Sequence, residues 1–259
     1  MKTFNRILIL AVSITFLSMA SFARDAKQDK AVAAFNKAQE ACAKGQYALA
    51  LNYYVEAYQN GEDIMSPACI AEIYMKGQHN GKPDMQEGVR WLKIAADKNG
   101  SFSGRVQCDL ATHYFMGVGV PRDLSKAFYY YSLSAKNGFV EGMYYLGLAY
   151  ENGEGTSVDI PKAIEWYKKA ANQGHAGAAN NLSRIYGMSQ YGINNVEEAA
   201  KWALFAAEKG DANAQLTVGN FYLHGYGLPE DRAKAVYWLR KAAEQGVTKA
   251  QIILAQLGY

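Results

Sequence analysis

The feature that most constrains this chain is a repeat with a period of 36 residues. Glycines at positions 138, 174, 210 and 246 recur at that spacing, and each follows a short segment such as Ala242-Ala243-Glu244-Gln245. Two aromatic series run in step with the glycines. One contains Trp91, Tyr130, Trp166, Trp202 and Trp238, and the other contains Tyr74, Tyr114, Tyr150, Tyr186 and Tyr222. A fixed period of about 20 to 50 residues is typical of stacked structural repeats.

The residue pattern within each unit predicts two helices joined by a glycine-containing loop. In residues 211–246 the pattern is interrupted between His224 and Pro229, after which Asp231 can cap the second helix. Small and apolar side chains recur at helical spacing on both sides of this break. They are Ala214, Val218, Gly219 and Tyr222 in the first helix and Ala235, Trp238, Leu239 and Ala242 in the second. We expect Trp238 to fill the space between the helices, and Gly246 to end the second helix in the left-handed conformation.

The pattern predicts an all-α fold, a right-handed α/α solenoid of about six hairpins that share one continuous core. The expected repeats cover residues 28–61, 65–100, 103–138, 139–174, 175–210 and 211–246, and a capping helix over 247–257 brings the helices to thirteen. Three loops carry a glycine pair, whereas residues 187–194 have Ser189 and Tyr191 at those places. Aspartates at 123, 159 and 231 are the expected caps, and Asn195 takes that role in the fifth repeat.

The first 23 residues resemble a secretory signal peptide rather than part of the fold. Lys2 and Arg6 precede an apolar run from Ile7 to Leu17, and Ser21-Phe22-Ala23 supplies small residues before Arg24. We expect cleavage near Ala23, with residues 24–259 forming the exported repeat domain. The periplasm is the expected destination and secretion is the alternative. An uncleaved amino-terminal anchor is a second reading of the same segment.

The charge of the chain gives no reason to expect nucleic acid as a partner. Removal of residues 1–23 takes away two basic residues and no acidic ones, so the formal net charge falls from +3 to +1. Basic residues alternate with acidic ones along the expected helices. A protein that binds nucleic acid usually concentrates its positive charge on one face.

Three cysteines, Cys42, Cys69 and Cys108, lie in the first half of the chain. An odd number leaves at least one unpaired within a monomer. We interpret them as small core residues, while one disulfide is possible and the sequence does not identify the pair.

The motif of the last full unit resembles the Sel-one-like repeat, a relative of the tetratricopeptide repeat with a longer loop between its helices. The resemblance is carried by Ala214-Gln215-x-x-Val218-Gly219-x-x-Tyr222, Gly225-x-Gly227, Asp231-x-x-Lys234-Ala235-x-x-Trp238 and Lys241-Ala242-Ala243-x-Gln245-Gly246. It extends over about residues 28–257. It implies a scaffold or adaptor of the bacterial cell envelope that binds a protein or peptide on its concave face. No stretch after the signal peptide is long and apolar enough to cross a membrane, so we expect no integral membrane segment after signal cleavage. A secreted host-interaction factor is an alternative role.

An enzyme is the main rival hypothesis, because some cysteine-rich relatives are described as β-lactamases or penicillin binders. Those relatives carry a cysteine pair in each repeat, and this chain does not. Serine β-lactamases use Ser-x-x-Lys, and no serine here has lysine three residues later. We therefore expect no catalytic residues.

The sequence also predicts neither a metal site nor a cofactor. The four histidines at 79, 113, 175 and 224 share no ligand spacing with one another or with the cysteines. The Gly-x-Gly pairs lack the preceding strand and the third glycine of a phosphate-binding loop, so we interpret them as turns.

The remaining variable positions fall on one side of the first helices when the repeats are aligned on tetratricopeptide geometry. These candidate positions are Arg105, Thr112, Tyr144, Leu148, Asn180, Arg184, Asn220 and His224. Asn, Arg and Tyr suit hydrogen bonds to a peptide backbone or a carboxylate. An ordinary solvated face, with binding elsewhere, is the alternative. In either case we expect Arg184 to be solvated and its loss to cost no more than about 0.5 kcal/mol, whereas truncation of Trp202 should cost roughly 3–5 kcal/mol.

Overall fold

The structure is a computed structural model that describes residues 26–61, 65–98, 102–188 and 193–259. These ranges contain thirteen α-helices and no strand, which confirms the predicted class and number of helices. The expected signal peptide over 1–23 lies outside the described residues, as do Ser189 and Tyr191. The helices are α2 (Ala26–Ala43), α3 (Tyr47–Asn60), α4 (Met65–Met75), α5 (Met85–Ala96), α6 (Ser103–Met116), α7 (Leu124–Lys136), α8 (Val140–Asn152), α9 (Ile160–Asn172), α10 (Ala176–Gly187), α11 (Val196–Glu208), α12 (Ala212–His224), α13 (Arg232–Glu244) and α14 (Thr248–Gln256).

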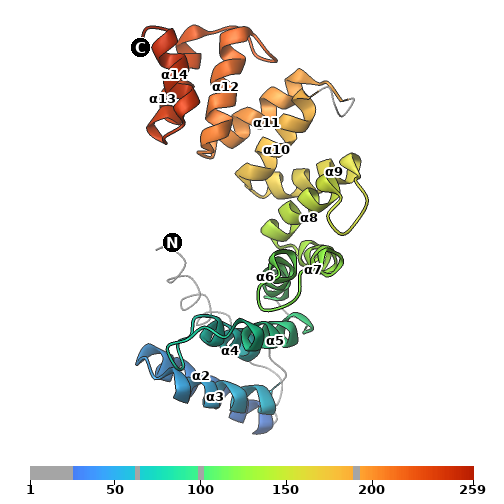
Figure 1. The fold of residues 1–259 in the computed structure, drawn as a ribbon, viewed down its shortest axis with the longest axis vertical. Helices are drawn as coiled ribbons and strands as arrows, with labels where there is room; N and C mark the ends of the chain where they lie inside the picture. The colour runs from blue at the N-terminus through green and yellow to red at the C-terminus, as the bar shows by residue number, and fades with distance from the viewer. Residues whose placement is uncertain (1–25, 62–64, 99–101, 189–192) are drawn as a thin grey trace.

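The helices pack in chain order as hairpins. The closest packing joins α2 with α3, α4 with α5, and so on to α12 with α13, and the second helix of each hairpin then packs on the first helix of the next. Figure 1 shows the resulting stack, with the blue α2–α3 hairpin at one end and the red α14 at the other. The stack is curved, and α6 and α8 lie on the inner side of the bend while α7 and α9 lie on the outer side.

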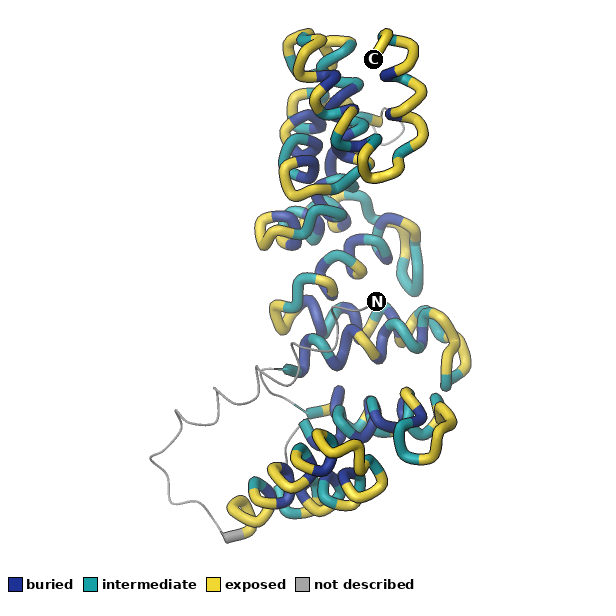
Figure 2. Tube along the Cα trace, turned by 90° about the vertical axis from the view of Figure 1, so that its left-hand side faces the viewer, coloured by how far each residue is buried: buried dark blue, intermediate teal, exposed yellow. Residues whose placement is uncertain are grey.

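Buried side chains run along the stack as a nearly continuous core. One large cluster extends from α4 to α12, and smaller clusters close the two ends. In Figure 2 the dark blue buried segments recur at every level of the stack. Small residues allow the helices to approach closely, because a Cβ placed on Gly147 of α8 would lie 2.6 Å from the ring of Tyr167 on α9. Tyr167 is completely buried as a result.

The tryptophan series does not fill the space between the helices as the sequence suggested. Three of the four tryptophans are only half-buried, namely Trp91, Trp166 and Trp238. The fourth, Trp202, is buried. The residue that directly follows each ladder residue in the sequence is more deeply buried than the ladder residue itself. This following position holds Tyr131, Tyr167 and Leu239 in three of the repeats, and all three are buried. A helix turns by about 100° per residue, so this neighbouring position faces the first helix of the same hairpin, and the half-buried tryptophans at 91, 166 and 238 lie at the edge of the core.

The two glycines of each loop have different roles. Gly153 ends α8 with a φ of 73°, and its backbone N–H donates to the carbonyl of Ala149, which is the expected left-handed helix cap. Gly155 also has a φ of 73°, but a Cβ there would lie 2.1 Å from the carbonyl oxygen of Leu124, at the start of α7 in the preceding hairpin. The same close approach occurs at Gly119 against Met85 and at Gly227 against Val196. The second glycine is therefore a contact between successive repeats.

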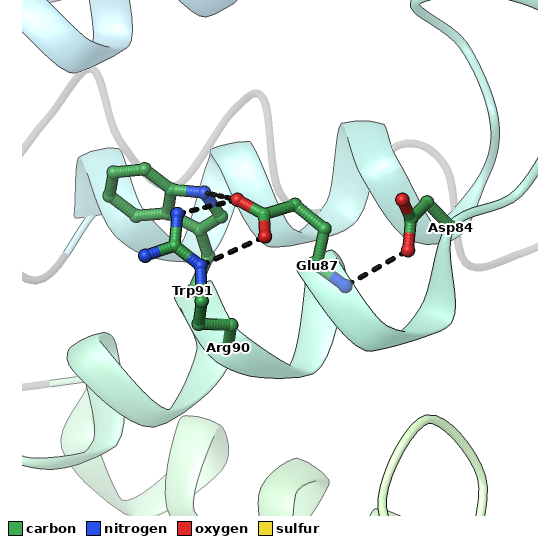
Figure 3. A network of polar contacts seen from close by, with 4 residues as sticks. All are labelled: Asp84, Glu87, Arg90 and Trp91. Atoms are coloured by element: carbon green, nitrogen blue, oxygen red, sulfur yellow. Dashed lines mark hydrogen bonds and ion pairs between the residues drawn. The ribbon is translucent and has the colours of Figure 1, made fainter.

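Side-chain caps begin the second helices, as predicted. The side chains of Asp123, Asp159, Asn195 and Asp231 each accept a hydrogen bond from the backbone N–H three residues later. Figure 3 shows the equivalent cap of α5, in which Asp84 accepts from the N–H of Glu87. The Glu87 carboxylate then accepts from Arg90 and from the indole N–H of Trp91. The hydrogen bond from Arg90 holds the pKa of the Glu87 carboxyl below its ordinary value. The indole N–H of Trp91 thus has a hydrogen-bond acceptor, Glu87, on its own helix.

Candidate interaction surface on the inner face

The eight candidate residues lie on four successive first helices. Arg105 and Thr112 lie on α6, Tyr144 and Leu148 on α8, Asn180 and Arg184 on α10, and Asn220 and His224 on α12. Arg184 and His224 are exposed, and the other six are half-buried. We call the side of the stack formed by these four first helices the inner face, because α6 and α8 lie on the inner side of the bend in Figure 1.

A cluster of aromatic rings lies at the centre of the inner face. The ring of Tyr145 on α8 stacks on Tyr131 of α7, with centroids 5.0 Å apart and an interplanar angle of 21°. Tyr144 stacks on His175 at 4.4 Å. Tyr145 keeps 37% of its surface exposed although it is packed on a buried ring, so it presents a rigid aromatic surface to solvent. Tyr145 carries no signal in the repeat alignment, because its aligned positions hold Asp109, Asn181 and Thr217.

Thr112 is engaged inside the protein rather than offered to a partner. Its hydroxyl lies 3.1 Å from the Tyr131 hydroxyl and donates to the carbonyl of Cys108. Thr112 therefore positions Tyr131, on which the exposed ring of Tyr145 rests.

Arg184 corrects one expectation from the sequence. Its guanidinium forms an ion pair with Glu151 of α8, whose side chain is only 6% exposed. Glu151 also accepts a hydrogen bond of 2.8 Å from the buried hydroxyl of Tyr167. Arg184 therefore faces a buried carboxylate and is not simply solvated, and we expect its loss to cost more than the roughly 0.5 kcal/mol that the sequence suggested.

The role of Glu151 was not predicted from the sequence, because Glu151 and its partner Arg184 lie on different helices. Arg184 and Glu151 are 33 residues apart and lie on α10 and α8. The repeat alignment does contain a signal, since Phe115 and Leu223 occupy the position of Glu151 in the third and sixth repeats. An acidic residue in an apolar column is a reason to expect a buried charged partner.

The amino-terminal part of the inner face carries acidic side chains. Asp109 of α6 lies 4.0 Å from Arg105, in an ion pair whose two side chains are both more than one third exposed. Crowding by protein atoms raises the pKa of the Asp109 carboxyl, Arg105 and His113 oppose that rise, and Glu72 and Glu141 add to it. The Asp109 side chain is nevertheless 55% exposed, so water screens these interactions. Arg105, like Arg184, already has an intramolecular acidic partner.

The described residues contain no group of three or more His, Cys, Asp or Glu side chains that could hold a metal ion. His224 is exposed at the end of α12, and His175 caps α10 through Nδ1, which accepts from the N–H of Ala178 at 3.0 Å. None of the helices in the described ranges is both long enough and apolar enough to span a membrane.

The fold and its repeated inner face define the chain as an α/α solenoid built from helical hairpins with capped second helices. The Sel1 repeat family model matches six segments, and the chain belongs to that family. The matched segments are residues 43–67, 70–100, 105–139, 140–175, 176–211 and 212–247.

Solved structures with the same fold include two that share 28% sequence identity with this chain. A protective antigen of uropathogenic Escherichia coli with an SLR fold superposes with a TM-score of 0.79, over 88% of this chain and 48% of that protein. A Sel1 repeat protein from Oxalobacter formigenes superposes with a TM-score of 0.69, over 83% of this chain and 86% of that one. The chain thus spans about half the length of the E. coli antigen. No curated protein sequence gives a significant match.

Proposed function

We propose that this protein is a non-catalytic scaffold that binds a protein or peptide partner on its inner face. Proteins of the Sel1 repeat family generally act as interaction scaffolds, and the family model accounts for most of this chain. The observation that carries the proposal is the exposed ring of Tyr145, which lies on the inner face and is held by stacking on Tyr131. Rigid aromatic side chains supply much of the contact area at protein interfaces for a small loss of conformational entropy.

Recognition of a peptide backbone fits the inner face better than recognition of a carboxylate. Arg105 and Arg184, the two cationic candidates, already form ion pairs with Asp109 and Glu151. A ligand carboxylate would have to compete with those partners. The side-chain amides of Asn180 and Asn220 each offer both donors and acceptors, which matches the alternating N–H and C=O groups of an extended peptide.

A catalytic role is not part of this proposal. The sequence lacks the Ser-x-x-Lys motif of the β-lactamase alternative, and the signature residues of the repeat are used for packing, caps and turns. A test for hydrolysis of a chromogenic cephalosporin by the purified protein decides the point. Turnover that disappears when a single residue of this chain is replaced would contradict the proposal.

We further propose that the protein is exported and acts in the bacterial envelope. The support is the arrangement of residues 1–23, with a basic start, an apolar run and small residues before Arg24. Mass spectrometry of the protein from its native host should find a chain that begins near Arg24. An intact Met1 in a cytoplasmic fraction would contradict this part of the proposal.

The binding proposal is tested with inner-face variants and matched outer-face controls. A partner is first isolated from envelope extract by crosslinking to the wild-type protein and is then purified. Replacement of Tyr145, Asn180 and Asn220 by alanine should weaken binding of that partner at least tenfold while the helical circular dichroism signal is retained. The control replaces Tyr129 and Asn172, exposed residues of the second helices α7 and α9, and should bind as the wild type does. Equal affinity of both variants would exclude this face as the binding site.

A further inference from the structure

The first two hairpins bring two of the three cysteines into one cluster. Cys42 lies near the end of α2 and Cys69 lies in α4, and both are half-buried. They pack against the same group of buried residues, which includes Tyr54 of α3. Cys108 belongs to α6 and packs in the separate central core. The structure therefore distinguishes one cysteine pair, where the sequence left three pairings open.

The hydroxyl group of Tyr54 joins the two thiols. The Cys42 sulfur lies 3.9 Å from the Tyr54 Oη and donates to it, and the Cys69 side chain forms a hydrogen bond with the same hydroxyl. Tyr54 is only 4% exposed. Both thiols therefore lie against one hydroxyl group, with the Cys42 sulfur 3.9 Å from it. A disulfide holds its two sulfurs only about 2.05 Å apart, so the bond requires the Tyr54 ring to move aside and the end of α2 to shift toward α4.

The position of α2 makes such a shift feasible. α2 is the first helix of the described residues and packs there mainly on α3, while α4 packs on both α3 and α5. We therefore expect a movement of the end of α2 toward α4 to alter the α2–α3 hairpin more than the hairpins that follow it.

The environment of Cys108 separates it from the other two cysteines. Cys108 is buried, and burial, with the nearby carboxylates of Asp109 and Glu141, raises its pKa to about 12. The thiolate is the reactive form in disulfide exchange, so Cys108 stays a protonated thiol at neutral pH. Burial also raises the pKa of Cys42, but there the Tyr54 hydroxyl, which can donate to the thiolate, opposes the rise.

We propose that Cys42 and Cys69 form an intramolecular disulfide in an oxidising environment and that Cys108 remains a thiol. The oxidant is a small-molecule disulfide. The thiolate of one cysteine attacks it, forms a mixed disulfide and releases one thiol. The second protein thiolate then attacks the bonded protein sulfur, so that the Cys42–Cys69 bond forms and the second thiol leaves. Two protons and two electrons pass from the protein to the oxidant. The product ties α2 to α4 across the first and second hairpins, independently of any partner on the inner face.

The experiment counts thiols in the full chain. Protein purified under reducing conditions is treated with oxidised glutathione at pH 8, alkylated, and analysed by intact mass and by non-reducing peptide mapping. We expect two of the three thiols to disappear without added glutathione mass, and a peptide pair that joins Cys42 to Cys69. The Cys108→Ser variant should form the same link, whereas Cys42→Ser should keep both of its thiols or carry glutathione on Cys69.

Three outcomes would overturn the proposal. They are a peptide pair that contains Cys108, disulfide-linked dimers as the main product, and full alkylation of all three cysteines after oxidation. Circular dichroism of Cys108→Ser and Cys42→Ser keeps the comparison valid, because both replacements should leave the helical signal unchanged. If Cys108→Ser does not fold, the wild-type peptide map alone decides between the pairs.

Discussion

The ammonium group of Lys162 lies over the ring of Tyr150, 5.3 Å from the ring centroid. Lys162 is on α9 and Tyr150 is on α8, and the same lysine forms an ion pair of 2.8 Å with the capping residue Asp159. The third and sixth repeats repeat this arrangement with Lys126 over Tyr114 and Lys234 over Tyr222. In these three repeats the tyrosine ladder found in the sequence therefore marks the place where the start of the second helix is held against the first helix.

The fifth repeat lacks this arrangement and depends on a neutral cap. Asn195 accepts from the N–H of Glu198 at 2.9 Å, and no lysine follows at the position of Lys162. We predict that Asn195→Ala destabilises the protein by about 1 kcal/mol, the usual cost of losing an N-cap side chain. Urea unfolding followed by circular dichroism measures this. Asn195→Ser, which retains a cap, should recover most of the loss, and equal losses for both variants would contradict the role of the cap.

Arg184→Ala should destabilise the protein measurably, because it removes the guanidinium that pairs with the buried carboxylate of Glu151. Breaking a fully buried ion pair costs roughly 3–5 kcal/mol. Since the Arg184 side chain is 39% exposed, we expect solvent screening to reduce the cost to about 1–2 kcal/mol. The double variant Glu151→Gln/Arg184→Ala removes the charge while keeping an acceptor for Tyr167, and its free energy of unfolding should lie closer to that of the wild type. A double variant that is less stable than Arg184→Ala would contradict the pairing.

Trp202→Ala should be more damaging than Arg184→Ala. Trp202 is 7% exposed, and truncation of a buried aromatic side chain costs roughly 3–5 kcal/mol. Trp238 has the same place in the last hairpin but is half-buried, so Trp238→Ala is the matched control and should cost less. The urea midpoints of Trp202→Ala, Trp238→Ala and Arg184→Ala give the order of their stabilities. Equal midpoints for Trp202→Ala and Trp238→Ala would show that burial does not decide the cost along this ladder.

The two glycines of one loop should respond differently to the same substitution. Both Gly153 and Gly155 have positive φ, so an alanine at either carries a strain of roughly 1–2 kcal/mol. Only Gly155 would also place its Cβ against the backbone of the preceding hairpin, at Leu124, whereas the nearest atom to Gly153 belongs to the side chain of Val158. We predict that Gly155→Ala lowers the thermal midpoint clearly more than Gly153→Ala. The reverse order would show that the loop does not carry the contact between repeats.

Stability should fall in mildly acidic solution in part because of His175. Burial lowers the pKa of this histidine, with a smaller opposing effect from Glu141. The unfolded chain then binds a proton more readily than the folded one, so the contribution of His175 is present above its unfolded pKa of about 6.5 and is lost as the pH falls below that value. His175→Asn keeps a capping side chain that does not titrate. The difference in urea midpoint between the two proteins should narrow from pH 7.5 to pH 5, and parallel pH curves would contradict the assignment.

The sequence predicted the hairpins and caps because both depend on local chemistry. The spacing of Ala214, Val218 and Tyr222 reports helical periodicity, and the cap of Asp231 involves an N–H only three residues away. The pairing of Arg184 with Glu151 could not be derived in this way, because it depends on how α8 and α10 pack. Tyr145 was missed for a similar reason, since its platform, Tyr131, comes from the second helix of the preceding hairpin.

The inner-face claim is tested most directly by site-specific photo-crosslinking in cells. A benzophenone amino acid replaces Tyr145 in one protein and Tyr129, which is 56% exposed on the second helix α7, in a matched control. Irradiation should attach a discrete partner of defined mass to the Tyr145 position, and the control should remain uncrosslinked at equal expression. A partner captured from the Tyr129 position and not from the Tyr145 position would contradict the account, because it would place the binding surface on the outer side of the stack.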